Sequence, residues 1–117
     1  MTLRPILAAA LAAPLLLAGF DADAHAHLVT SSPAENAAVA APKAIAMKFS
    51  EKLEGKFSGA DLMKADGTAV PARSKVAAKS ITATPAAALA PGAYKVMWHA
   101  VAADGHKSTG QYSFTVK

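Results

Sequence analysis

The stretch Ala93-Tyr94-Lys95-Val96-Met97-Trp98-His99-Ala100-Val101 decides the fold class of this chain. Successive side chains of a β-strand point to opposite faces, so alternate residues of this stretch share a face. One face should build a core and consists of Tyr94, Val96, Trp98 and Ala100. The other face is mixed and carries Lys95, Met97, His99 and Val101. The turn signal Pro91-Gly92 stands directly before the strand.

The rest of the chain is broken into similar short pieces by prolines and glycines, and no long amphipathic helical stripe emerges. Further strands are expected over residues 28–32, 44–50, 57–64, 70–76, 80–84 and 111–116. Asp66-Gly67 is a hairpin signal after the third of these. About seven short antiparallel strands in a chain of this length predict an all-β, Ig-like Greek-key β-sandwich.

The first 24 residues have the pattern of a cleaved signal peptide. Arg4 supplies a positive start, residues 6–20 are apolar, and the small-x-small motif Ala22-Asp23-Ala24 follows. The apolar run is short for a transmembrane helix, which needs about 20 apolar residues. We therefore predict a signal peptide over residues 1–24, a single domain over residues 25–117 and a periplasmic location.

Charge and cysteine content narrow the classes of function. The formal net charge is +4, but the lysines and arginines are scattered singly, which argues against nucleic-acid binding. There is no cysteine. A metal site in this chain would therefore use histidine, carboxylate, methionine or a terminal amine.

Cleavage after Ala24 would make His25 the first residue of the mature chain. Its free α-amine and its Nδ1 could then close a chelate ring on one metal ion, a histidine brace. Asp104 and His106 form a second candidate pair, because residues i and i+2 of extended backbone point the same way, about 6.6 Å apart. Three nitrogens and one oxygen in a plane suit Cu(II), although Zn(II) could accept the same atoms tetrahedrally.

The same N-terminus allows a second way of holding Cu(II). The free amine, the amides of Ala26 and His27, and the His27 imidazole could wrap the ion locally. This local motif requires the loss of two amide protons, whereas the brace requires only loss of the amine and imidazole protons. Near neutral pH we therefore expect the brace, with His27 as a weaker additional ligand at most.

The remaining histidine and methionine residues are weaker candidates for a metal site. His99 should be an exposed strand residue, and Met47, Met63 and Met97 are too well separated in the sequence to suggest a Met-rich Cu(I) site. No nucleophile motif, phosphate-binding loop or HExxH sequence is present. These absences favour a binding protein over an enzyme.

Several segments together resemble the CopC family of periplasmic copper-resistance proteins. The family's mature start resembles residues 25–35 (HAHLVTSSPAE), and its ending resembles residues 92–101, 104–108 and 110–116. Phe49-Ser50-Glu51, after an alternating strand, fits as well. The resemblance covers the whole of residues 25–117.

The resemblance implies a periplasmic Ig-like sandwich that binds one Cu(II) for copper tolerance or homeostasis. By position, the family's ligands would be His25, Asp104 and His106, while the position of His27 varies in the family. It further implies a non-enzymatic monomer with an inner-membrane copper transporter of the CopD type as partner. Two rival hypotheses remain: a small brace-type copper monooxygenase or oxidase, and a metal-free interaction module.

Overall fold

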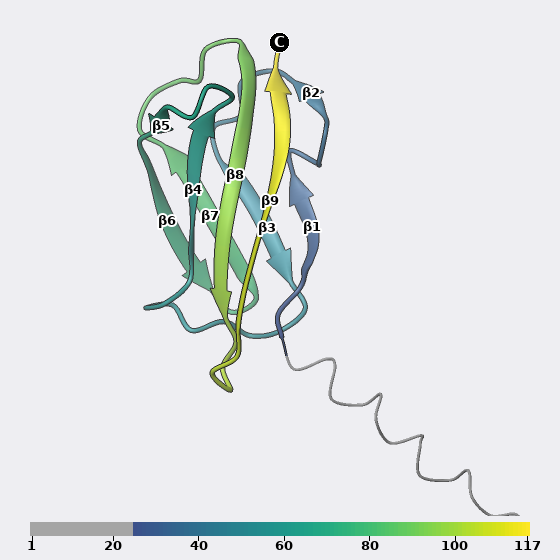
Figure 1. Cartoon of the computed structure of the whole chain (residues 1–117), viewed down its shortest axis with the longest axis vertical. Helices are drawn as coiled ribbons and strands as arrows, with labels where there is room; N and C mark the ends of the chain where they lie inside the picture. Colours follow the sequence, from purple (N-terminus) through teal and green to yellow (C-terminus); the bar gives the residue numbers. More distant parts are fainter. Residues whose placement is uncertain (1–24) are drawn as a thin grey trace, which may run out of the picture.

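The computed structural model describes residues 25–117, which form two β-sheets packed face to face (Figure 1). The predicted signal peptide, residues 1–24, lies outside the described residues. One sheet has four strands in the order β1 (Leu28–Ser32), β3 (Ile45–Phe49), β7 (Ser80–Pro85) and β6 (Ala72–Ala77). The other has five, in the order β2 (Ala38–Val39), β9 (Lys107–Val116), β8 (Gly92–Val101), β4 (Gly59–Lys64) and β5 (Ala69–Val70). The predicted all-β sandwich is confirmed, and residues 25–117 contain no α-helix.

Three details differ from the sequence-based expectations. The piece expected as one strand over residues 70–76 is split at Pro71, so that β5 belongs to one sheet and β6 to the other. Proline has no N–H to donate to a ladder and marks the crossing between the sheets. The last strand begins at Lys107 rather than at residue 111, because the β8–β9 ladder continues as far as the pair Val101–Lys107.

The short strand β2 was not expected at all, and it runs parallel to β9. Together with the division at Pro71, it makes nine strands instead of about seven. The parallel β2–β9 pair also departs from the predicted antiparallel arrangement. A two-residue strand has no period to detect in the sequence. Its pairing depends on main-chain hydrogen bonds to β9, such as that from Thr115 N–H to the Ala37 carbonyl, 2.8 Å.

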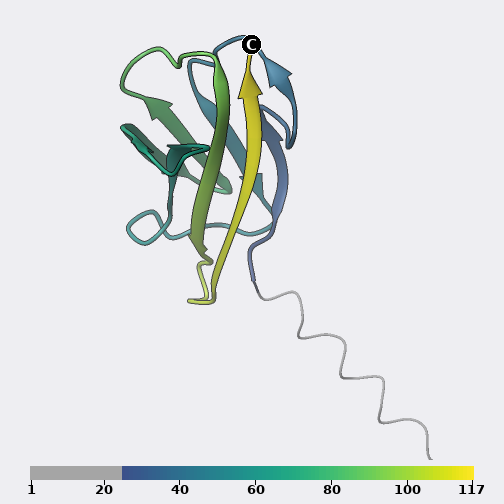
Figure 2. The same ribbon diagram turned by 45° about the horizontal axis from the view of Figure 1, so that its top comes forward.

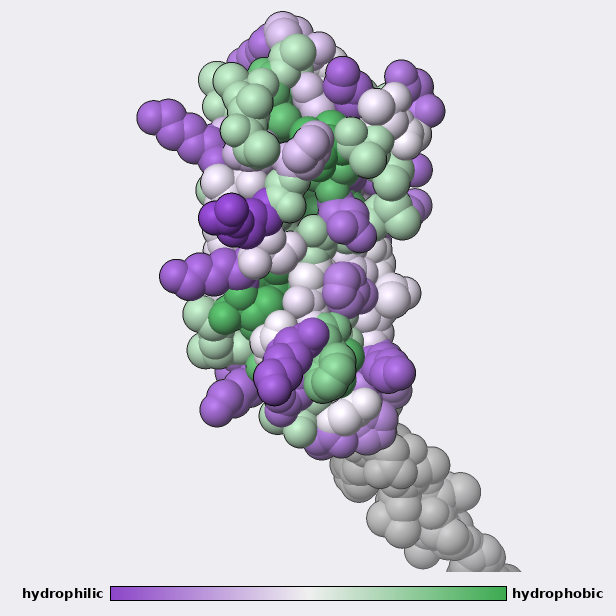
Figure 3. Space-filling view, turned by 90° about the vertical axis from the view of Figure 1, so that its left-hand side faces the viewer, coloured by the Kyte–Doolittle hydropathy of each residue, from purple (hydrophilic) through white to green (hydrophobic). Residues whose placement is uncertain are grey.

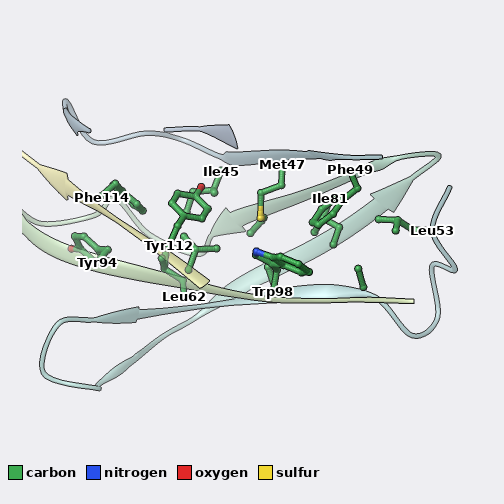
Figure 4. Close-up of a cluster of buried hydrophobic side chains, with 14 of the residues drawn as sticks. Ile45, Met47, Phe49, Leu53, Leu62, Ile81, Tyr94, Trp98, Tyr112 and Phe114 are labelled. Atoms are coloured by element: carbon green, nitrogen blue, oxygen red, sulfur yellow. The ribbon is translucent and has the colours of Figure 1, made fainter. Parts of the chain in front are cut away.

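The core lies between the two sheets, and the labelled side chains of Figure 4 fill it from both sides. The predicted inward face of β8 is buried, and alternate residues of β3 and of the second half of β9 are buried with it. Phe49 of one sheet meets Trp98 of the other edge to face, with ring centroids 5.0 Å apart. Trp98 in turn lies against Gly110, where a Cβ atom would stand 2.3 Å from Trp98 Cζ2. A glycine is required at position 110 because the indole occupies the space of a side chain.

The surface around this core is mixed. On the face shown in Figure 3, hydrophilic side chains are spread among hydrophobic patches. Two large apolar side chains of the described chain, Val29 and Phe57, are more than half exposed, at 62% and 63%. Within residues 25–117, no helix has the length and apolar character needed to cross a membrane.

The two views in Figures 1 and 2 show where the chain enters β1 and where β8 turns into β9. Both features lie at the same end of the sandwich, and the C-terminus lies at the opposite end. The fold therefore brings residues near position 25 close to residues near position 105, although 80 positions separate them in the sequence.

Candidate metal centre

A tight turn joins β8 to β9 and carries Asp104 and His106. Gly105 has a φ of +94°, a backbone conformation that glycine adopts without the steric cost of a side chain. The N–H of Gly105 donates to the Ala102 carbonyl, and the N–H of Ala102 donates to the His106 carbonyl, each at 2.8 Å. These bonds close the turn and fix the backbone on both sides of the two polar residues.

Asp104 and His106 contact each other within this turn. Asp104 Oδ1 lies 3.0 Å from His106 Nδ1 and also accepts a hydrogen bond from the His106 backbone N–H at 3.1 Å. The side-chain bond, and then the backbone bond, hold the pKa of Asp104 below its ordinary value. With Nδ1 facing the carboxylate, Nε2 of His106 and the second oxygen of Asp104 are left for a ligand. Both side chains are about half exposed, at 48% for His106 and 54% for Asp104, so a ligand from solvent can reach them.

The segment that leads to β1 is anchored by its middle residue, Ala26. The Ala26 side chain is 1% exposed and belongs to the hydrophobic core, while its carbonyl accepts a hydrogen bond from Ser108 Oγ at 2.8 Å. The next residue, His27, donates its N–H to Ser50 Oγ at 2.9 Å and accepts the Ser50 N–H at its carbonyl, also at 2.9 Å. The chain between His25 and His27 is thus held by both sheets.

Anchoring this segment places the His25 ring against the ring of His106. The two centroids are 5.0 Å apart, and the planes meet at 73°. His106 therefore contacts each of the other two residues predicted as ligands, His25 through its ring and Asp104 through its Nδ1. No three His, Cys, Asp or Glu side chains within residues 25–117 are grouped closely enough to hold a metal ion by themselves.

The other candidates stand apart from this group. His27 is exposed, and the hydrogen bonds that fix it are made by its backbone. His99 is exposed on the outer face of β8, as predicted, and its ring lies over Gly59 of β4. Met47 is fully buried in the core, whereas Met97 is 38% exposed on the outer side of the five-stranded sheet.

Two residues that hold this centre were missed by sequence reasoning, Ser50 and Ser108. Both lie in segments that resemble the CopC family, residues 49–51 and 104–108, but neither segment by itself shows what its hydroxyl group contacts. The bond between Ser108 and Ala26 spans 82 positions, so only the folded chain reveals it.

Comparison with known proteins identifies the family. Residues 28–117 match the CopC domain. The chain is 46% identical over 99 residues to Protein YobA of Escherichia coli strain K12, covering 80% of each chain. It is 44% identical over 108 residues to Copper resistance protein C of Escherichia coli, covering 84% of this chain and 86% of that protein.

A solved structure agrees with these sequence matches. The crystal structure of PcoC, a methionine-rich copper resistance protein from Escherichia coli, superposes with a TM-score of 0.73 at 42% identity. The match covers 80% of this chain and all of that one. From the family match, the identities and the shared sandwich, this chain belongs to the CopC family.

Proposed function

We propose that this protein binds one Cu(II) ion in the periplasm and serves copper tolerance or homeostasis. The observation that carries the proposal is the contact of the His25 ring with His106, which is itself bonded to Asp104. Relatives named for copper resistance support the choice of metal. Cu(II) prefers nitrogen and oxygen donors in a tetragonal plane, and this end of the sandwich offers both.

In this proposal a signal peptide, residues 1–24, is removed and residues 25–117 form the copper-binding domain. His25 then contributes its α-amine and its Nδ1, His106 contributes an imidazole nitrogen, and Asp104 contributes a carboxylate oxygen. His27 is at most a weaker ligand. The Asp104–His106 bond also sets the orientation of the imidazole, as carboxylates do for histidines that bind metals.

Binding rather than catalysis is the proposed task. An anionic oxygen from Asp104 stabilises Cu(II) and fills a position that dioxygen would need, which disfavours the oxidase alternative. A domain as small as residues 25–117 also offers little surface for a polymeric substrate. Peroxide formation by the copper-loaded protein with ascorbate is the measurement that would revive this alternative. We further propose a monomer that exchanges copper with an inner-membrane transporter of the CopD type.

The test is a Cu(II) titration of the exported protein, with intact mass showing that it begins at His25. Asp104→Ala should weaken binding by at least about 10- to 100-fold, the range seen when a group that orients a metal-binding histidine is removed. His106→Ala removes a ligand outright and should weaken binding at least as much. His27→Ala should change the affinity much less, and His99→Ala is the matched control for an exposed histidine on the same sheet. Unchanged affinity in His106→Ala, or a chain that begins elsewhere than His25, would remove the basis of the brace.

The oxidation state gives a second test. We expect Cu(I) to bind weakly, because Met47 is sealed in the core and leaves only two of the three candidates, Met63 and Met97, on the outer face of the other sheet. Thioether ligands select Cu(I) only when several of them converge. A Cu(I)-specific chelator should therefore strip Cu(I) from the protein while Cu(II) is retained. Strong retention of Cu(I) would show that the methionines act together.

A further inference from the structure

We infer that Ser50 and Ser108 determine which of two copper-binding modes the N-terminus adopts. In the brace, copper joins His25 to His106 and Asp104. In the local motif, the amine, the Ala26 and His27 amides, and the His27 imidazole surround the ion without help from the rest of the fold. This inference rests on the proposed function and concerns how the same N-terminus is directed toward one mode.

The two serines hold opposite ends of one peptide unit. The carbonyl oxygen of Ala26 and the N–H of His27 belong to the same peptide plane. Ser108 Oγ, from β9 of the five-stranded sheet, donates to that carbonyl at 2.8 Å. Ser50 Oγ, just after β3 of the four-stranded sheet, accepts from that N–H at 2.9 Å. The plane is therefore fixed by one hydroxyl from each sheet.

Two further contacts reinforce this hold. Ser50 N–H donates to the His27 carbonyl at 2.9 Å, so the Ser50 residue binds His27 through both its side chain and its backbone. The Ala26 methyl group is packed in the core at 1% exposure. Position 26 is thereby anchored by packing as well as by hydrogen bonding.

The local motif is incompatible with this arrangement. Its formation replaces the protons on the Ala26 and His27 nitrogens by two bonds to copper, and the two protons pass to solvent. The His27 nitrogen can no longer donate to Ser50, and the peptide plane must turn so that both nitrogens face one ion. The bond from Ser108 to the Ala26 carbonyl and the burial of the Ala26 methyl group oppose such a turn.

The brace requires none of these changes. The His25 main-chain nitrogen and ring lie outside the held peptide unit, and the ring lies against that of His106. Ser50 and Ser108 therefore leave the brace donors free while they withhold the His27 amide. In the unfolded chain both serines release the peptide, and the local motif becomes available. The fold, through two hydroxyl groups, suppresses a copper site that the N-terminal tripeptide would otherwise form.

The experiment compares Ser50→Ala, Ser108→Ala and the double variant as Cu(II)-loaded exported proteins near neutral pH. Visible absorption and electron paramagnetic resonance spectra report the donor atoms. Four nitrogens in the plane exert a stronger field than three nitrogens and one oxygen, so the local motif absorbs at shorter wavelength. The wild type should show a single spectrum that His27→Ala leaves unchanged. Each serine removed should raise the share of the four-nitrogen form about fivefold, the effect of one hydrogen bond.

The matched control is Ser74→Ala. The Ser74 hydroxyl bonds the Ala60 backbone at 2.9 and 3.0 Å, far along the chain from the N-terminus, and its loss should leave the copper spectrum unaltered. The decisive outcome is a four-nitrogen component in the serine variants that disappears when His27→Ala is added. If the double variant does not fold, Ser50→Ala alone decides, because the bond that it removes is exposed.

Failure of this inference is distinguishable from failure of the proposed function. If His106→Ala alters the wild-type spectrum but the serine variants keep that spectrum, the brace exists and the serines do not select it. If His27→Ala alters the wild-type spectrum and His106→Ala does not, the local motif already prevails in the folded protein and both ideas are wrong.

Discussion

The two ends of the β8–β9 pair are built in opposite ways. At the end that carries the C-terminus of the chain, here called the closed end, Tyr94 of β8 stacks on its cross-strand partner Phe114 of β9. The ring centroids are 5.6 Å apart and the planes are 16° from parallel. Both rings are nearly sealed, at 3% and 1% exposure. Toward the turn, Asp104 and His106 are about half exposed and are held by a few polar contacts.

The difference shows how a small sandwich can separate stability from binding. Apolar side chains packed at the closed end resist displacement, because any gap costs both contacts and buried area. Exposed polar side chains at the turn end contribute little to stability and can rearrange around an ion. The same pair of strands carries the apolar packing and the polar side chains. One end can therefore be altered by mutation while the other end shows whether the fold is intact.

The largest expected effect is a loss of stability when the aromatic packing at the closed end is removed. Phe114→Ala should lower the free energy of unfolding by about 3–5 kcal/mol, the usual cost of removing a buried aromatic ring. Urea unfolding followed by tryptophan fluorescence would measure it, since Trp98 is the single tryptophan. Phe57→Ala is the control: Phe57 is 63% exposed, and its loss should change stability by no more than about 0.5 kcal/mol. Similar losses in both variants would contradict the contrast between the ends.

The second expected effect is stabilisation of the folded protein by Cu(II) bound at the turn end. A ligand that binds only the folded state, at a free concentration about 100 times its Kd, stabilises that state by about 2.7 kcal/mol. Cu(II) should therefore raise the melting temperature of the wild type, measured by thermal unfolding with and without the metal. His106→Ala should remove most of the rise. The local motif would bind the unfolded chain as well, so an absent rise with tight binding would favour that mode.

The smallest expected effect comes from comparing the hydroxyl groups of two buried tyrosines. The Tyr94 hydroxyl donates to the Ala90 carbonyl at 2.6 Å, whereas the buried Tyr112 hydroxyl has no hydrogen-bond partner of normal geometry. Burial raises the pKa of Tyr112, and an interaction with the side chain of Ser31 opposes the rise. Tyr94→Phe should cost about 1 kcal/mol, while Tyr112→Phe should be neutral or stabilising, because it removes an unsatisfied polar atom. A larger loss for Tyr112→Phe in urea unfolding would show that its hydroxyl is satisfied.

Much of the fold could be read from alternation. The inward face of β8 was predicted residue by residue, since apolar residues recur at every second position of a strand with one buried face. The parallel strand β2 and the first residues of β9 could not be predicted. Their pairing is set by partners distant in the sequence. Neither β2 nor residues 107–111, which are polar or glycine, shows an alternation of apolar and polar residues.

The candidate site divides in the same manner. The types of donor were evident from the motif around Ala24-His25 and from Asp104-Gly105-His106. Their mutual distance was not, because nothing in either segment encodes a contact with the other. The roles of Ser50 and Ser108 were equally hidden, since a serine hydroxyl acquires a partner only when the backbone brings one.

By itself, the sequence determined the alternating strands, the turn signals and the chemical nature of the donor atoms. These are local properties, fixed by side-chain type and by spacing along one segment. The tertiary structure decided that His25 meets His106, that Pro71 marks a change of sheet, and that two serines hold the peptide between Ala26 and His27. The physical reason is that burial in a common core aligns segments far apart in the chain. Contacts at the rim of that core then follow from the packing rather than from either segment alone.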